Sequence, residues 1–120
     1  MRKLSILALT ATLAVPAAAH HSFAMFDMTK NQTVIGTVTE FRWTNPHAWL
    51  HLDVPGAGGA TDSWAIEMTS PNNLLKAGWR RSSLKLGDKA TVTFHPLVNG
   101  KKGGSLNNVT LPGGQVLENK

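Results

Sequence analysis

The order of the predicted elements constrains this fold more than any single motif. Three strand-like segments come first, a short helix-like segment follows, and two more strand-like segments complete the chain. Dense β-branched residues and alternating polarity indicate strands at residues 33–43, 47–54, 63–69, 89–94 and 105–114. This order predicts an all-β fold with one short helix, an OB-like five-stranded small barrel whose helix plugs one end. A small β-sandwich is the alternative, and residues 115–120 can add a short pairing.

The first predicted strand has a glycine near its centre. Gly36 lies among β-branched residues, a position that indicates a bend or a bulge. A long, bent first strand fits a barrel, because such a strand must turn a corner. Strict alternation along it predicts Val38 and Glu40 on one side and Phe41 on the other.

Segment 70–79 has the boundary signals of a short helix. Ser70 is the predicted N-cap, and Pro71 stands at the first helical position, where its missing N–H costs nothing. Gly78 predicts the end of the helix.

Residues 1–19 have the composition of a secretory leader and not of a folded element. Arg2 and Lys3 precede an apolar run at 4–15 that is too short to span a bilayer, and small residues follow at 17–19. We therefore expect a signal peptide at 1–19, cut after Ala19, and a periplasmic or secreted protein. The expected organisation of the remainder is an N-terminal arm at 20–32 and one OB-like β domain at 33–120.

The predicted cleavage exposes two adjacent histidines. Because the chain has no cysteine, a metal ion must be held by His, Met, carboxylates or the terminal amine. The amine and imidazole of His20, with His21 next to it, can chelate Cu(II), and Met25 and Met28 offer thioethers suited to Cu(I). Cleavage after Ala18 would give another copper-chelating start. We predict a small periplasmic protein that binds or handles copper; a surface arm without a metal role is the alternative.

Further ligands must come from the barrel, where His47 and His95 are the predicted metal ligands. His51 lies four residues from His47, which is about 13 Å along an extended strand, so these two cannot share one ion. Neighbouring strands are about 4.8 Å apart, so a shared ion across strands is within reach. Alternatively, His47 follows a turn proline and only ties loop backbone by hydrogen bonds.

Glu67 is a lone carboxylate in an otherwise apolar strand segment. We expect it to face solvent beside Ala65; if it is buried it needs a partner, for which Arg42, Arg80 or a histidine can serve. A lone carboxylate provides no acid–base pair, and no nucleophile with a base and no phosphate-binding loop is found. The sequence favours binding over catalysis, with copper mono-oxygenase chemistry at a histidine terminus as the enzymatic alternative.

Four tryptophans are many for a chain of 120 residues. If they are exposed on one face, Trp43, Trp49 and Trp64 predict a stacking platform. The protein would then be an OB-like module that binds a small molecule, a glycan or a partner protein without metal. Burial of these side chains in the barrel core is the competing interpretation.

The chain is mildly basic, which we interpret as a source of solubility with a weak tendency toward acidic partners. The formal charge is +5, and removal of Arg2 and Lys3 leaves +3. We expect no nucleic-acid partner for an exported protein, no membrane span after signal removal, and a metal ion or a periplasmic protein as the partner. Basic residues at 76–85 indicate a solvated edge, with an anion or membrane-surface contact as the alternative.

An ordered series of short motifs resembles a known family. The series is HHSF near residue 20, then GTVTEFRWTNPHAWL, WAIE, SPNNLLKAGW, LKLGD, HPL and GG. It resembles a family of small exported proteobacterial proteins catalogued as a domain of unknown function, across nearly all of the chain after residue 19. The resemblance implies a periplasmic, signal-bearing single domain and supplies no activity, cofactor or site residue.

Overall fold

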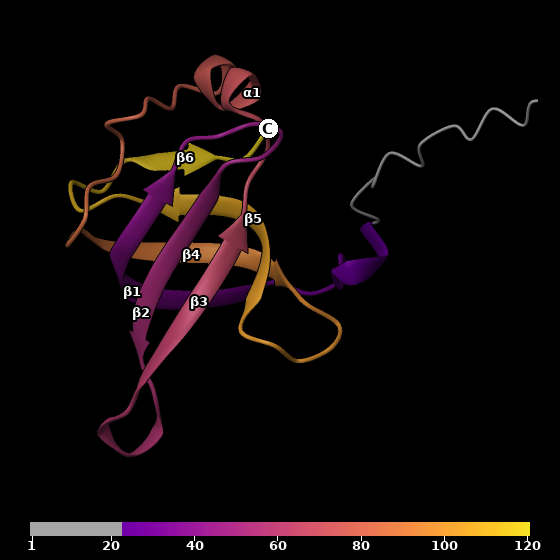
Figure 1. Cartoon of the computed structure of the whole chain (residues 1–120), viewed down its shortest axis with the longest axis vertical. Coiled ribbons are helices and arrows are strands. Elements are labelled where there is room, and N and C mark those ends of the chain that lie inside the picture. Colours follow the sequence, from indigo (N-terminus) through magenta and orange to yellow (C-terminus); the bar gives the residue numbers. More distant parts are fainter. Residues whose placement is uncertain (1–22) are drawn as a thin grey trace, which may run out of the picture.

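Six strands form one sheet in the order β3-β2-β1-β4-β5-β6, and a parallel pairing of β3 with β5 closes the first five into a barrel (Figure 1). The computed structural model describes residues 23–120. The strands are β1 (Gln32–Arg42), β2 (Trp49–Pro55), β3 (Thr61–Glu67), β4 (Lys89–Pro96), β5 (Gly103–Thr110) and β6 (Val116–Glu118). The helices are α1 (Pro71–Lys76) and the 3-10 turns η1 (Phe23–Met25) and η2 (Ala57–Gly59). The predicted OB-like barrel with one short helix is confirmed.

The irregularity of β1 lies beyond Gly36. The register with β2 shifts between Val38 and Glu40, so Glu40 faces outward opposite His51 and Phe41 turns toward the core. The predicted alternation is therefore wrong after Val38, because a bulge adds one residue and inverts the faces. Gly36 serves a different purpose: a Cβ there would lie 2.8 Å from the carbonyl oxygen of Asp53, so glycine lets β1 and β2 approach closely.

Helix α1 closes one end of the barrel, where it lies beside β6 (Figure 1). The Ser70 hydroxyl accepts a hydrogen bond from the Asn73 N–H, and Pro71 begins the helix, as predicted. Leu74 and the following Trp79 are fully buried, and the Trp79 indole N–H donates to the Glu118 carbonyl at 2.8 Å. Within residues 23–120 no helix has the length and apolarity needed to cross a membrane.

The described part of the predicted arm, residues 23–31, packs along the end of β4 (Figure 1). Phe26 forms a β-bridge with Leu97, and its side chain is buried. The Asp27 N–H donates to the Pro96 carbonyl at 2.8 Å, and the Val98 N–H donates to the Met25 carbonyl at 3.0 Å. The arm therefore pairs with the end of β4 and with the loop that follows it. The predicted signal peptide and the first residues of the arm lie outside the described residues.

Candidate functional site

A cavity of about 340 Å³ lies at the barrel wall beside the arm. Its apolar lining comes from the arm and from core residues at the strand ends, namely Phe26, Met28, Met68 and Leu106. Its titratable lining residues are His47, Glu67, His95 and Lys120. The volume is within the range of small-ligand sites, and a few polar groups facing apolar walls are typical of such sites.

Strand register explains why distant residues meet at this cavity. Glu67 of β3 is the pairing partner of Ser105 of β5, and Ser105 in turn pairs with His95 of β4. The three residues form one row across adjacent strands, so the backbones of Glu67 and His95 are roughly 10 Å apart. His47 approaches from the loop before β2, and Trp49 at the start of that strand pairs with Glu67.

His47 and Glu67 form a short, partly buried hydrogen bond. The distance from Nδ1 of His47 to Oε1 of Glu67 is 2.6 Å, and the carboxylate is buried. Glu67 leaves the strand on the side of Ala65, as expected, but the expectation that it faces solvent is wrong. Beside an ionised carboxylate, which only accepts, a neutral His47 would donate from Nδ1 and carry its lone pair on Nε2.

His95 adopts the same tautomer for a different reason. Its Nδ1 lies 2.8 Å from the carbonyl oxygen of Lys30 in the arm. A carbonyl oxygen only accepts, so Nδ1 of His95 donates and Nε2 carries the lone pair. Both cavity histidines thus hold the same ring nitrogen against an acceptor, one supplied by a side chain and the other by the backbone.

The structure brings together two of the four predicted metal ligands. His47 and His95 line one cavity with Met28, whereas His20 and His21 lie outside the described residues. Within residues 23–120, no group of three or more His, Asp or Glu side chains is close enough to hold a metal ion. A metal at this cavity therefore needs donors beyond the described carboxylates and imidazoles.

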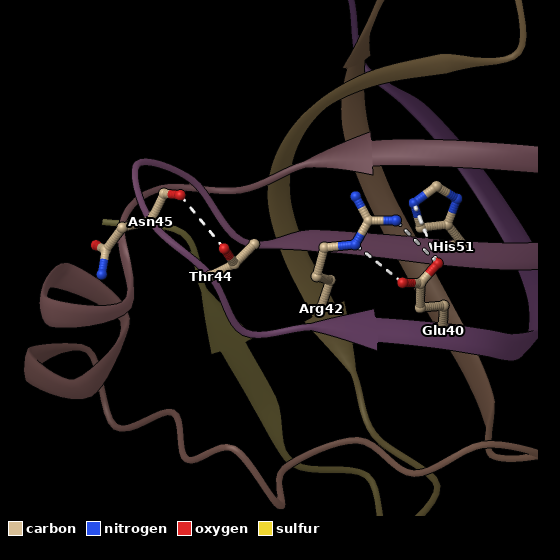
Figure 2. A network of polar contacts seen from close by, with 5 residues as sticks. All are labelled: Glu40, Arg42, Thr44, Asn45 and His51. Atoms are coloured by element: carbon tan, nitrogen blue, oxygen red, sulfur yellow. Dashed lines mark hydrogen bonds and ion pairs between the residues drawn. The ribbon is translucent and has the colours of Figure 1, made fainter.

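His51 points away from this cavity and joins a second polar cluster on the outer face of β1 and β2 (Figure 2). Arg42 donates to Glu40 from Nε at 2.9 Å and from Nη2 at 3.2 Å. Nε2 of His51 lies 3.9 Å from the same carboxylate, beyond hydrogen-bond distance. The Arg42 hydrogen bonds lower the pKa of Glu40, with smaller contributions from the charges of Arg42 and His51.

The three tryptophans of the predicted platform occupy different surroundings. Trp64 packs on Phe94 with ring centroids 5.4 Å apart, and Trp43 meets Phe41 edge-on at 5.8 Å. Trp49 lies on the outer face of β2 beside His51, with centroids 6.4 Å apart. Trp43 also lines a second, shallow hollow with Arg80 and Arg81. A platform that combines these tryptophans stays a prediction.

Sequence reasoning overlooked the C-terminal residues of the cavity. Asn119 accepts a hydrogen bond from the Thr69 N–H at 2.7 Å and donates to the Leu106 carbonyl at 2.9 Å. These two hydrogen bonds hold Asn119 between the residue that follows β3 by two positions and strand β5, at the rim of the cavity. A lone Asn near a chain end has no periodic or spacing signal, so only the tertiary structure reveals its role.

The fold and the site define a class: a small closed OB-like barrel with a histidine- and glutamate-containing cavity on its wall. Within that class the chain belongs to the family of unknown function DUF6152, whose sequence profile matches residues 8–107. The predicted resemblance to a family of unknown function is therefore confirmed.

Comparison with solved structures agrees with the fold. The chain is similar to the mitochondrial single-stranded DNA-binding protein Rim1 from S. cerevisiae, with a TM-score of 0.51 and 12% sequence identity. The match covers 76% of this chain and 96% of that chain, and at this identity it establishes the fold alone. No curated protein matches the sequence.

Proposed function

We propose that this protein binds a copper ion at the cavity lined by His47 and His95. The observation that carries the proposal is a geometry that these two histidines share, because Nδ1 of each lies within hydrogen-bond distance of an oxygen that can accept. Metal-binding histidines commonly donate their second ring nitrogen to a carboxylate or a backbone carbonyl, which orients the ring and raises its basicity. Both kinds of acceptor occur here.

The remaining donors in this proposal are His20 and His21. Four residues lie between His21 and Phe26, which lines the cavity, and a chain of this length can span at most about 18 Å. Cleavage after Ala19, which is part of the proposal, would add the amine of His20. Imidazoles and an amine suit Cu(II), and the thioether of Met28 suits Cu(I).

The first experiment tests the terminus. The protein is expressed with its own leader and recovered from the periplasm, its intact mass is measured, and its metal content is determined. Copper affinity is then compared with that of a variant with one glycine inserted before His20. We expect a mass that starts at His20, bound copper, and weaker binding by the insertion variant. Equal affinities, or another start, would remove the amine from the site.

The second experiment tests the cavity. His47→Gln and His95→Gln should each weaken copper binding, whereas His51→Gln should leave it unchanged. His51 is a matched control because it is also a partly buried histidine of this barrel but does not line the cavity. An equal effect of all three substitutions would show nonspecific imidazole binding and contradict the proposed site.

A second candidate is a small organic ligand in the same cavity. The volume of about 340 Å³ and the apolar walls of Phe26, Met68 and Leu106 favour it. Native mass spectrometry of the periplasmic protein distinguishes the two functions. A bound mass of several hundred daltons would support the organic ligand, and a bound mass that matches copper would support the metal.

A further inference from the structure

The basic side chains of the described residues fall into two groups, those that form ion pairs and those that do not. Outside residues 76–89, most described lysines and arginines form ion pairs, namely Lys30 with Asp27, Arg42 with Glu40, Lys102 with Asp62 and Lys120 with Glu118. Within residues 76–89, here called the basic segment, none of the basic residues pairs with a described carboxylate. These are Lys76, Arg80, Arg81, Lys85 and Lys89. The basic segment therefore carries most of the uncompensated positive charge of residues 23–120.

The one acid of the basic segment does not neutralise it. Asp88 accepts a hydrogen bond from the backbone N–H of Lys85 at 2.9 Å, which fixes the turn before β4. This bond engages the carboxylate with the backbone and leaves the Lys85 ammonium to solvent. A segment with five cations and one backbone-bound carboxylate attracts anions over a Debye length, about 8–10 Å at physiological salt.

The basic segment also borders a shallow hollow of about 500 Å³, which is lined by Trp43, Leu75, Arg80, Arg81 and Ser82. Arg80 is held in place, because its guanidinium donates to the Trp79 carbonyl at 2.7 Å and its backbone N–H donates to Ser83 Oγ at 2.7 Å. A fixed guanidinium beside a second one, with no carboxylate in the lining, suits a phosphate or similar anionic group.

Exposed aliphatic side chains accompany these cations. Leu86 is 72% exposed, the largest value among the exposed large hydrophobic residues of the described chain, and Leu75 is 44% exposed. Single exposed leucines are common on protein surfaces. Leu86 lies within the basic segment, and Leu75 precedes it and lines the hollow with Trp43. Exposed aliphatic residues among unpaired cations are the composition of surfaces that lie on anionic lipid.

We propose that the basic segment, with Trp43, Leu75 and Leu86, docks on the surface of an anionic lipid bilayer. The cations supply long-range attraction, the hollow receives a headgroup phosphate, and the leucines enter the interface. The aliphatic residues favour lipid over a nucleic acid or a polyanionic peptide, which would leave them in water. None of these residues lines the cavity of His47 and His95, so this proposal is independent of copper binding.

Vesicle flotation tests the docking surface. The protein recovered from the periplasm is mixed with vesicles of neutral phosphatidylcholine, or of phosphatidylcholine with phosphatidylglycerol, at low and high salt. We expect binding to the anionic vesicles alone, and weaker binding at high salt. Arg81→Glu should reduce partitioning about tenfold or more, because each basic residue near such a surface contributes roughly fivefold and the substitution adds a repelled charge.

Two matched controls separate docking from general attraction. Lys101→Glu changes the net charge equally, at an unpaired lysine of the β4–β5 loop, and should have a smaller effect than Arg81→Glu. Leu86→Ser should weaken binding, whereas Val98→Ser, at a residue 64% exposed in the same loop as Lys101, should not. Circular dichroism and thermal melting confirm that each variant is folded.

Three results would overturn the proposal. Binding that is equally sensitive to Arg81→Glu and Lys101→Glu would show only the attraction of a basic protein to an anionic surface. Vesicle binding insensitive to both would place the contact elsewhere in the chain. Binding to a single-stranded oligonucleotide or to polyglutamate without vesicle binding would identify an acidic macromolecule as the partner.

Discussion

Two histidine–glutamate pairs lie close together on this barrel and differ in almost every physical respect. Nδ1 of His47 is 2.6 Å from the Glu67 carboxylate, which is 7% exposed. Nε2 of His51 is 3.9 Å from the Glu40 carboxylate, which is 46% exposed. The two histidines are four residues apart, yet one pair borders a cavity and the other lies on an open face.

The difference shows that surroundings decide what a residue pair does. Arg42 binds both oxygens of Glu40, so this carboxylate is compensated without His51, whose buried Nε2 has no hydrogen-bond partner among the described residues. Glu67 is buried at the cavity wall, where water screens its hydrogen bond to His47 far less. We therefore assign to Glu67 a positioning role for His47, and to Glu40 a place in a surface network.

The largest expected contrast is in copper affinity, and it rests on the proposed function. Glu67→Gln should weaken copper binding about 10- to 100-fold, the usual effect of losing a carboxylate that orients a metal-binding histidine. Glu40→Gln should leave the affinity unchanged. Isothermal titration of both variants measures the difference. If Glu67→Gln binds copper as the wild type does, Glu67 does not position His47 for a metal.

The next contrast is in folding stability and requires no metal. Glu67→Ala should lower the free energy of unfolding by about 1–3 kcal/mol, because a partly buried imidazole loses its acceptor. Glu40→Ala should have a much smaller effect on the free energy of unfolding, because that carboxylate is exposed. Urea unfolding of the metal-free variants checks both. A more stable Glu67→Ala would mean that burial of the carboxylate costs more than its hydrogen bond returns.

Much of the architecture was predictable from local signals. Ser70 and Pro71 marked the start of α1, and alternating β-branched residues marked the strands, because capping and periodicity act over a few neighbouring residues. The position of the bulge after Val38 was not predictable, because it depends on how β1 pairs with β2. The sequence indicated an irregularity at Gly36 itself. Glycine is needed there because the neighbouring strand approaches closely.

The site was predictable only as far as residue type. His47 and His95 were named because imidazoles bind metals, and the structure places both at one cavity. The burial of Glu67 was not predictable, because the residue faces outward from its strand. It is covered by the arm and by the C-terminal residues, which also line the cavity and are distant in sequence. Asn119 was overlooked for the same reason.

A smaller effect concerns the tautomers of the two cavity histidines. At a pH where the rings are neutral, His47 and His95 should carry their proton on Nδ1, held by Glu67 and by the Lys30 carbonyl. In Glu67→Gln, whose amide can also donate, the preference of His47 should decline while that of His95 persists. Long-range nitrogen–proton NMR spectra distinguish the tautomers. An Nε2-protonated His47 in the wild type would contradict the geometry on which the copper proposal rests.

The smallest expected effect is the titration of Glu40, which tests the claim that Arg42 compensates this carboxylate. The Arg42 hydrogen bonds hold the pKa of Glu40 below its ordinary value of 4.5. Arg42→Gln should raise this pKa toward 4.5, as measured by the carboxyl carbon shift, whereas Arg81→Gln should not.

The same ion pair makes a small contribution to stability that depends on pH. A pKa that is lower in the folded protein stabilises the fold at pH values above the ordinary pKa, and that contribution is lost as the pH falls through the lowered pKa. The wild type and Arg42→Gln should therefore differ slightly in melting temperature above pH 4.5 and converge in stronger acid, because an exposed pair contributes little. A Glu40 pKa that Arg42→Gln leaves unchanged would assign the compensation to His51 and make the two histidine–glutamate pairs more alike than their distances indicate.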